Sequence, residues 1–188
     1  GGSQVFLGPG EEQTLETLLK CIVVASANDA SVAVAEYIGG SVEGFVKLMN
    51  DKAKQLGMEN TNFTNPHGLS DPEHYTTAYD IALMSRELVK YPMLFKWSTI
   101  WMDYLEHTDK ERDPTMLANT NKLLGKYEGL DGLKTGYHSK AGHCFAGTAK
   151  RGDLRLISVV LNAPSSNQRF EDTVKLLDYG FGHYDSIK

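Results

Sequence analysis

Cysteine is scarce in this sequence, with only Cys21 and Cys144 among 188 residues. Both stand among apolar neighbours, which favours buried free thiols. A single disulfide between them stays open as an alternative, but there is no framework of paired cysteines. The six histidines show no spacing typical of a metal site, so we expect neither a metal nor a cofactor.

Long apolar runs and an excess of basic charge are also lacking. The longest apolar run, residues 21–27, is far shorter than the roughly 20 residues of a membrane-spanning helix. The net charge of −5 comes without a basic cluster, which argues against a nucleic-acid partner. No signal peptide is recognisable, and a start at Gly1-Gly2 without Met is typical of a processed chain or a fragment.

Apolar residues recur at helical spacing through the first part of the chain. They predict helices over residues 14–24, 30–38, 41–57 and 77–90, and a short one over 93–97. Thr14 and Thr77 are suited to cap two of these helices, and Gly39-Gly40 should end another. Residues 58–76 read as a long loop, and loops of that length are usually functional.

From Gly132 the period of the apolar residues changes to two. This predicts strands over residues 132–138, 143–149 and 154–161, followed by a helix over 166–179. Residues 98–118 show no clear pattern beyond an extended piece near 101–105, where Trp101 and Tyr104 are expected to pack, like Trp97. The prediction is one α+β domain over 1–188, mainly helical over 14–125, with three antiparallel strands and a helix over 129–188.

Two short polar motifs carry the chemistry. Ser26-Ala27-Asn28 lies between two predicted helices, and Lys134-Thr135-Gly136 lies on a predicted strand. The lysine supplies charge and the threonine a hydrogen-bond donor, while the glycine lets a ligand lie against the backbone. Each motif alone is weak evidence for a functional site. A helix cap would explain the first motif as well, and a solvated lysine on a strand would explain the second.

Taken together and in this order, the motifs resemble the penicillin-binding D-alanyl-D-alanine carboxypeptidases, the serine peptidases that trim peptidoglycan. The resemblance runs from Gly1 to Tyr179 and is carried by Gly1–Gln4 with Pro9–Glu11, Ala25–Ala30, Asn65–Leu69, Thr76–Asp80 and Asp131–Tyr137. It implies the fold of β-lactamases and transpeptidases, here in incomplete form. It also implies an acyl-enzyme, a stem-peptide substrate ending in D-Ala-D-Ala, and inhibition by β-lactams.

The resemblance assigns roles to seven residues. Ser26 would relay protons and pair with Lys134, which supplies positive field, and Asn28 would hold a substrate amide. Thr135 would bind the terminal carboxylate, Gly136 would leave room for it, and the backbone N–H of Tyr137 would be half of an oxyanion hole. Arg169 matches an arginine that several members of the family place near the substrate carboxylate.

The nucleophile of this family stands in a Ser-x-x-Lys motif, and no serine of these 188 residues is followed by Lys at that spacing. In the family that motif lies upstream of the stretch that begins this chain. We therefore expect the 188 residues to be inactive alone and to need a second segment, either the missing N-terminal part or a swapped copy. The resemblance implies an extracytoplasmic protein at the cell surface or in the periplasm, held at the membrane only through segments absent here.

Two other functions stay open on the sequence. A class A-like β-lactamase needs a glutamate for fast deacylation, and only Glu59 and Glu73 of the long loop are candidates. A non-catalytic module of the same fold, binding cell-wall peptide or a partner, would explain the missing Ser-x-x-Lys motif.

Overall fold

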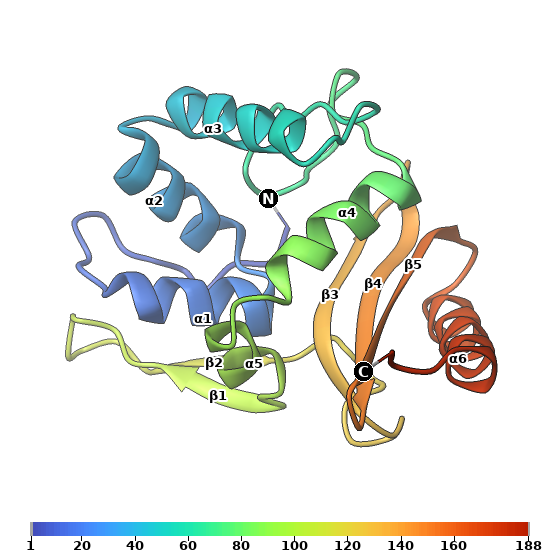
Figure 1. Ribbon diagram of the computed structural model, residues 1–188. Helices are drawn as coiled ribbons and strands as arrows, with labels where there is room; N and C mark the ends of the chain where they lie inside the picture. Colours follow the sequence, from blue (N-terminus) through green and yellow to red (C-terminus); the bar gives the residue numbers. More distant parts are fainter. Residues whose placement is uncertain (1, 188) are drawn as a thin grey trace. The chain divides into compact units, whose positions relative to one another are not determined.

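The computed structural model describes residues 2–187, and its elements divide into two compact units (Figure 1). Unit 1 comprises Gly1–Gln55, Thr61–Tyr75 and Ile100–Thr120, and unit 2 comprises Leu56–Asn60, Thr76–Thr99 and Asn121–Lys188. Helices followed by three antiparallel strands and a C-terminal helix confirm the predicted α+β class.

Unit 1 is built on three helices, α1 (Leu15–Ala25), α2 (Asn28–Gly39) and α3 (Val42–Gln55). Thr14 caps α1 as predicted, because its side chain accepts a hydrogen bond from the Thr17 N–H at 3.1 Å. Gly40 ends α2 in the left-handed conformation that favours glycine. The apolar side chains that α1 and α2 bury form the unit's interior: Leu18, Cys21, Val24, Ala30, Val34 and Ala35.

The start of α2 differs from the prediction. The helix begins two residues earlier than expected, at Asn28, and its cap position is Ala27, which has no side chain able to accept a hydrogen bond. The Asp29 carboxylate accepts hydrogen bonds from the backbone N–H groups of Val5 and Leu7. These hydrogen bonds hold the N-terminal segment against α2.

A two-stranded antiparallel sheet completes unit 1, with β1 (Met102–Leu105) paired to β2 (Thr115–Ala118). Side chains alternate between a buried side with Leu105 and Leu117 and an exposed side with Tyr104 and Met116. Tyr104 is therefore 51% exposed, and Trp101, which directly precedes β1, is 53% exposed. The expectation that these two side chains pack therefore does not extend to burial in a core. Only Trp97, in unit 2, is buried as predicted.

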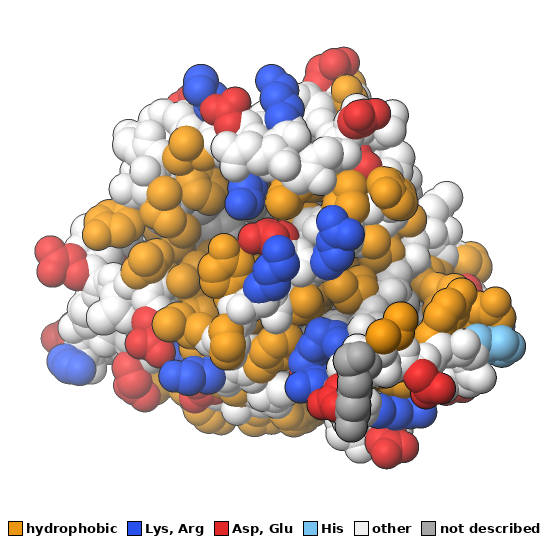
Figure 2. Space-filling view, in the orientation of Figure 1, with side chains coloured by type: hydrophobic (Ala, Val, Ile, Leu, Met, Phe, Trp, Pro, Cys, Tyr) orange, Lys and Arg blue, Asp and Glu red, His pale blue; other side chains and the backbone are white. Residues whose placement is uncertain are grey.

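Hydrophobic side chains are visible at the surface over α1 and α2 in Figure 2. The exposed ones of these two helices are Leu15, Tyr37 and Ile38. No helix within residues 2–187 is long and apolar enough to cross a membrane.

Unit 2 is a three-stranded antiparallel sheet in the order β3 (Leu130–His138), β4 (Gly142–Arg151) and β5 (Leu154–Ala163). These strands confirm the predicted ones and extend them by a few residues. Helices α4 (Ala78–Leu88) and α5 (Met93–Ser98) also contact the sheet. One buried cluster joins the sheet to α6 (Ser166–His183): Leu130, Phe145, Ala149, Phe170 and Leu177.

Helix α6 continues past the predicted end at Tyr179 to His183, although Gly180 and Gly182 would ordinarily weaken a helix. Gly180 is fully within the helix, and a Cβ built on it would lie 2.5 Å from Leu156 Cδ1 of β5. The glycine is therefore there to let helix and strand approach closely, and it does not act as a stop signal.

Candidate active site

Strand β3 carries the Lys-Thr-Gly motif opposite the first half of β4. Thr135 is paired with Phe145, Gly136 with Cys144 and Tyr137 with His143. Thr135 is buried, whereas Gly136 and Tyr137 are exposed. A Cβ built on Gly136 would meet only Cys144 Cβ, at an ordinary contact distance of 4.0 Å. The fold itself does not require a glycine here, so the bare backbone is available to a ligand.

Lys134 is half-buried, and its Nζ donates a hydrogen bond to the Thr135 carbonyl at 2.7 Å. Burial disfavours the ammonium form, and the nearby positive charge of Arg169 adds to the effect. Together they lower the pKa of Lys134 from 10.5 to about 8. The surroundings of the Lys134 ammonium therefore do not neutralise its positive charge.

Arg169 comes from the first turn of α6, which Ser165 caps by accepting a hydrogen bond from the Gln168 N–H. The side chain is buried, with 7% of its surface exposed. Its Nη1 donates to the Gly136 carbonyl at 3.1 Å and to the Cys144 carbonyl at 3.3 Å. Burial lowers the pKa of this guanidinium from its ordinary value.

Neither cation has an acidic partner among the ion pairs that the described residues form. The acid nearest to Lys134 in sequence, Asp131 of β3, is engaged by Arg155 of β5 through two hydrogen bonds of 2.7 and 2.8 Å. Lys134 and Arg169 therefore leave uncompensated positive charge beside Thr135 and Gly136. Such a place favours an anionic ligand.

Tyr137 stacks on His143 of β4, with the ring centroids 4.3 Å apart and the planes 26° from parallel. The tyrosine side chain remains 64% exposed at the surface. The stack places an aromatic surface at the end of β3.

The second motif forms the corner between α1 and α2 in unit 1. Ser26 adopts a left-handed backbone conformation, with φ 60° and ψ 37°, and its N–H donates to the Ile22 carbonyl at 3.1 Å. A residue other than glycine rarely adopts this conformation, and such strain is concentrated at functional positions. The strained turn holds the serine at the point where the chain reverses from one helix into the next.

Asn28 follows that corner as the first residue of α2, and its backbone N–H donates to the Ser3 carbonyl at 2.9 Å. A Cβ built on Gly2 would lie 2.4 Å from Asn28 Nδ2, so the asparagine side chain rests against the N-terminal segment. The contact explains why a glycine precedes Ser3.

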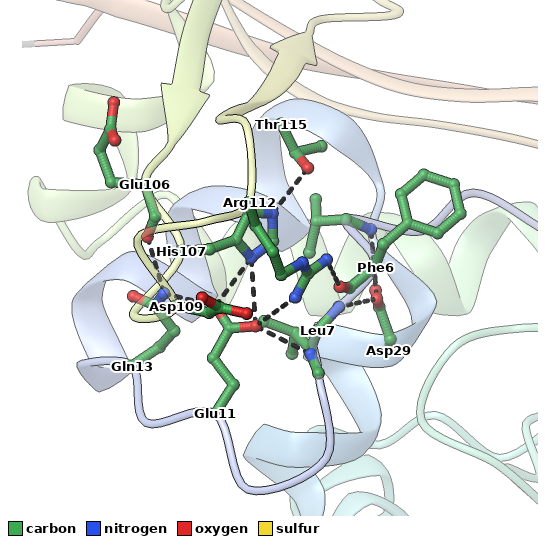
Figure 3. A network of polar contacts seen from close by, with 12 residues as sticks. Phe6, Leu7, Glu11, Gln13, Asp29, Glu106, His107, Asp109, Arg112 and Thr115 are labelled. Atoms are coloured by element: carbon green, nitrogen blue, oxygen red, sulfur yellow. Dashed lines mark hydrogen bonds and ion pairs between the residues drawn. The ribbon is translucent and has the colours of Figure 1, made fainter.

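A buried polar network in turn holds the N-terminal segment (Figure 3). The Glu11 carboxylate accepts hydrogen bonds from the Gly8 N–H at 2.8 Å and from Arg112 at 3.0 Å, and lies 2.9 Å from His107 Nδ1. Arg112 also donates to the Phe6 carbonyl, and Asp29 receives the flanking N–H groups of Val5 and Leu7. The segment before α1 is thus fixed on both sides of Phe6.

Burial alone would raise the pKa of the Glu11 carboxyl. The hydrogen bonds from Gly8, Gln13 and His107 outweigh burial, and its pKa falls from 4.5 to about 2. The carboxylate therefore stays charged and bonded at any ordinary pH.

Of the predicted site residues, five are brought together in unit 2: Lys134, Thr135, Gly136, Tyr137 and Arg169. Ser26 and Asn28 share the α1–α2 corner in unit 1. Sequence reasoning missed the role of Asp29 as an anchor and of the Cys144 carbonyl as a partner of Arg169. No side-chain pattern could have indicated the second, because a backbone group makes the contact.

Known proteins resemble this chain over nearly its whole length. A family described as D-alanyl-D-alanine carboxypeptidase matches residues 1–165. The D-alanyl-D-alanine carboxypeptidase DacF of Bacillus subtilis is 50% identical over 187 residues, covering 99% of this chain and 47% of that protein. The chain thus spans about half the length of the curated relatives it matches.

Solved structures agree. The D-alanyl-D-alanine carboxypeptidase DacD from Francisella tularensis superposes with a TM-score of 0.91 at 33% identity, covering 100% of this chain and 56% of that one. Penicillin-binding protein D2 from Listeria monocytogenes, in its cefotaxime-bound form, gives 0.80 at 38% identity, covering 90% and 67%. The chain belongs to the D-alanyl-D-alanine carboxypeptidase family.

Proposed function

We propose that the full-length protein is a serine-type D-Ala-D-Ala carboxypeptidase. It removes the terminal D-alanine from peptidoglycan stem peptides through an acyl-enzyme, and it works outside the cytoplasm, at the cell surface or in the periplasm. The observation that carries the proposal is the uncompensated positive charge of Lys134 and Arg169 beside Thr135 and the bare backbone of Gly136. A peptide that ends in a free carboxylate suits such a site.

Each site residue receives a role in this proposal. Lys134 and Arg169 attract the substrate's carboxylate, and the Thr135 hydroxyl donates a hydrogen bond to it. The Tyr137 N–H stabilises the oxyanion that forms when the carbonyl is attacked, and losing one such donor costs about 10²–10³ in rate. Ser26 transfers a proton to the leaving amine, and Asn28 holds the substrate's amide.

The attacking serine and its lysine base are proposed to lie outside these 188 residues, because no serine here precedes a lysine at the required spacing. A second polypeptide segment, N-terminal or from a swapped copy, would supply them. Held at the membrane by other parts of the protein, the catalytic domain would meet its substrate in the cell wall.

β-Lactams are the proposed inhibitors. The Listeria relative was solved in a cefotaxime-bound form, and a β-lactam offers a carboxylate next to a reactive carbonyl. The same positive charge that attracts the peptide terminus would attract the drug, and the serine would be acylated in the same way.

The test uses the full-length protein and a fluorescent penicillin. Lys134→Ala should abolish labelling and release of D-alanine while the unfolding transition changes little, because this lysine ion-pairs with no acid of the described residues. Lys140→Ala, at an exposed lysine between β3 and β4, is the matched control and should label like the natural protein. Unimpaired labelling of Lys134→Ala would refute the assignment of this site.

A further inference from the structure

We infer that Arg169 is a positioning residue that fixes the peptide unit between Gly136 and Tyr137. The inference rests on the proposed function, in which the N–H of that peptide is an oxyanion donor. It differs from the role that family resemblance gives this arginine, which is contact with the substrate's carboxylate.

The hydrogen bonds of the guanidinium carry the inference. Arg169 Nη1 donates to the Gly136 carbonyl at 3.1 Å and to the Cys144 carbonyl at 3.3 Å. These two residues are paired across β3 and β4, so one nitrogen joins both strands at the end of the Lys-Thr-Gly motif. The carbonyl of Gly136 and the N–H of Tyr137 belong to the same planar group. Fixing the oxygen therefore fixes the direction of the N–H.

The guanidinium is itself held in one orientation. Its Nη2 donates to Ser166 Oγ at 3.2 Å, its carbon lies 4.8 Å from the centre of the Phe170 ring, and the side chain is buried. The pairing of β4 with β5 shifts register between His143 and Phe145, so Cys144 lies at an irregular point of the sheet. Arg169 thus bonds to the backbone at a break in the ladder between β4 and β5.

Electrostatics act in the same direction. A hydrogen bond from a charged donor is about twice as strong as a neutral one. When such a donor binds the carbonyl of a peptide, it polarises the whole group and makes its N–H a better donor. Arg169 would thus both aim the Tyr137 N–H and strengthen it.

The kinetic test compares a penicillin with its methyl ester on the full-length protein. Arg169→Lys keeps the charge but loses the planar fork. We expect it to slow acylation by both compounds equally, by about tenfold to a hundredfold, the range that small misplacements of a site produce. Arg155→Lys is the matched control, because Arg155 anchors β3 through Asp131 without touching Gly136. It should leave both rates unchanged.

A second measurement does not depend on activity. The amide proton of Tyr137 should move upfield in the NMR spectrum of Arg169→Lys and stay in place in Arg155→Lys. Ser166→Ala, which frees Nη2 and keeps the arginine, should give a smaller shift in the same direction, and it serves if Arg169→Lys does not fold.

The outcomes separate the inference from the proposed function. A loss confined to the free acid would mean that Arg169 contacts the carboxylate, and an unmoved Tyr137 amide would likewise overturn the inference. If the natural protein is labelled by neither compound, the proposed function fails, and the amide resonance still decides whether Arg169 fixes this peptide.

Discussion

At the scale of single residues, burial and a neighbouring cation both work against the charged form of Lys134. Its pKa of about 8 means that the ammonium persists below pH 8 and is lost as the pH rises above it. Attraction of a carboxylate should weaken over the same range. The lysine is thus most effective as a cation at neutral pH and below.

We expect an NMR titration of Lys134 Nζ to show a midpoint near pH 8. Arg169→Met should raise that midpoint toward 10.5, because it removes the second cation. The same midpoint in both proteins would show that the two charges are not coupled.

Ser26 offers a second prediction at this scale. Its left-handed conformation costs a residue other than glycine about 1 kcal/mol. Ser26→Gly should therefore raise the free energy of unfolding by about that amount and, under the proposed function, abolish release of D-alanine. Ser26→Ala is the control, since it removes the hydroxyl but retains the strain. Equal stability of the two variants in urea unfolding would show that no strain is stored here.

At the scale of elements, the Glu11 network determines how the N-terminal segment meets α2 and the β1–β2 sheet. Glu11 is 4% exposed at its side chain, and its partners come from the segment before α1 and from the loop between β1 and β2. With a pKa of about 2 in the folded state and 4.5 when unfolded, the carboxylate stabilises the fold above pH 4.5. That contribution is lost as the pH falls from 4.5 toward 2.

The expected contribution of Glu11 is about 3 kcal/mol at pH 7, from 1.36 kcal/mol per pKa unit. Urea unfolding of Glu11→Gln should show a loss of that order at pH 7, and the loss should shrink as the pH approaches 2. The exposed neighbour variant Glu12→Gln should differ little from the natural protein at either pH. A deficit in Glu11→Gln that does not change with pH would contradict the assigned cause.

Most helices and the three long strands could be predicted from the sequence, because their apolar residues recur at the spacing typical of each element. Strand β2 could not, since its four residues expose Met116 and gain their stability only from pairing with β1. The predicted end of α6 was too early, because Gly180 is needed for close packing against Leu156 of β5 and does not end the helix. Both misses concern interactions between residues distant in the sequence.

The candidate site, like the fold, could be predicted only in part from the sequence. Lys134, Thr135 and Gly136 are visible as a motif, and a resemblance to known enzymes gave them meaning. Arg169 could be named but its contacts could not, since its partners are the carbonyl groups of Gly136 and Cys144. The sequence of side chains does not specify which backbone groups they reach.

At the scale of the whole molecule, the apolar side chains exposed on α1 and α2 bear on its state in solution. Leu15, Tyr37 and Ile38 are exposed on these two helices of unit 1, and Figure 2 shows hydrophobic side chains at the surface over α1 and α2. We expect the folded 188 residues to purify with a second segment or copy covering that surface. Size-exclusion chromatography with intact mass spectrometry checks this, and a stable monomer would contradict it.

Gly136 has a consequence for drug resistance. A methyl group at this position would meet the protein only at 4.0 Å, so the fold would accept an alanine without loss of stability. Under the proposed function, Gly136→Ala would place a methyl group where the β-lactam lies. Folding would not prevent a population exposed to the drug from acquiring this substitution. The natural peptide, however, would lie against the same bare backbone as the drug. Resistance by this route would therefore be limited by impaired wall trimming, and stability measurements on the mutant protein would give no sign of the defect.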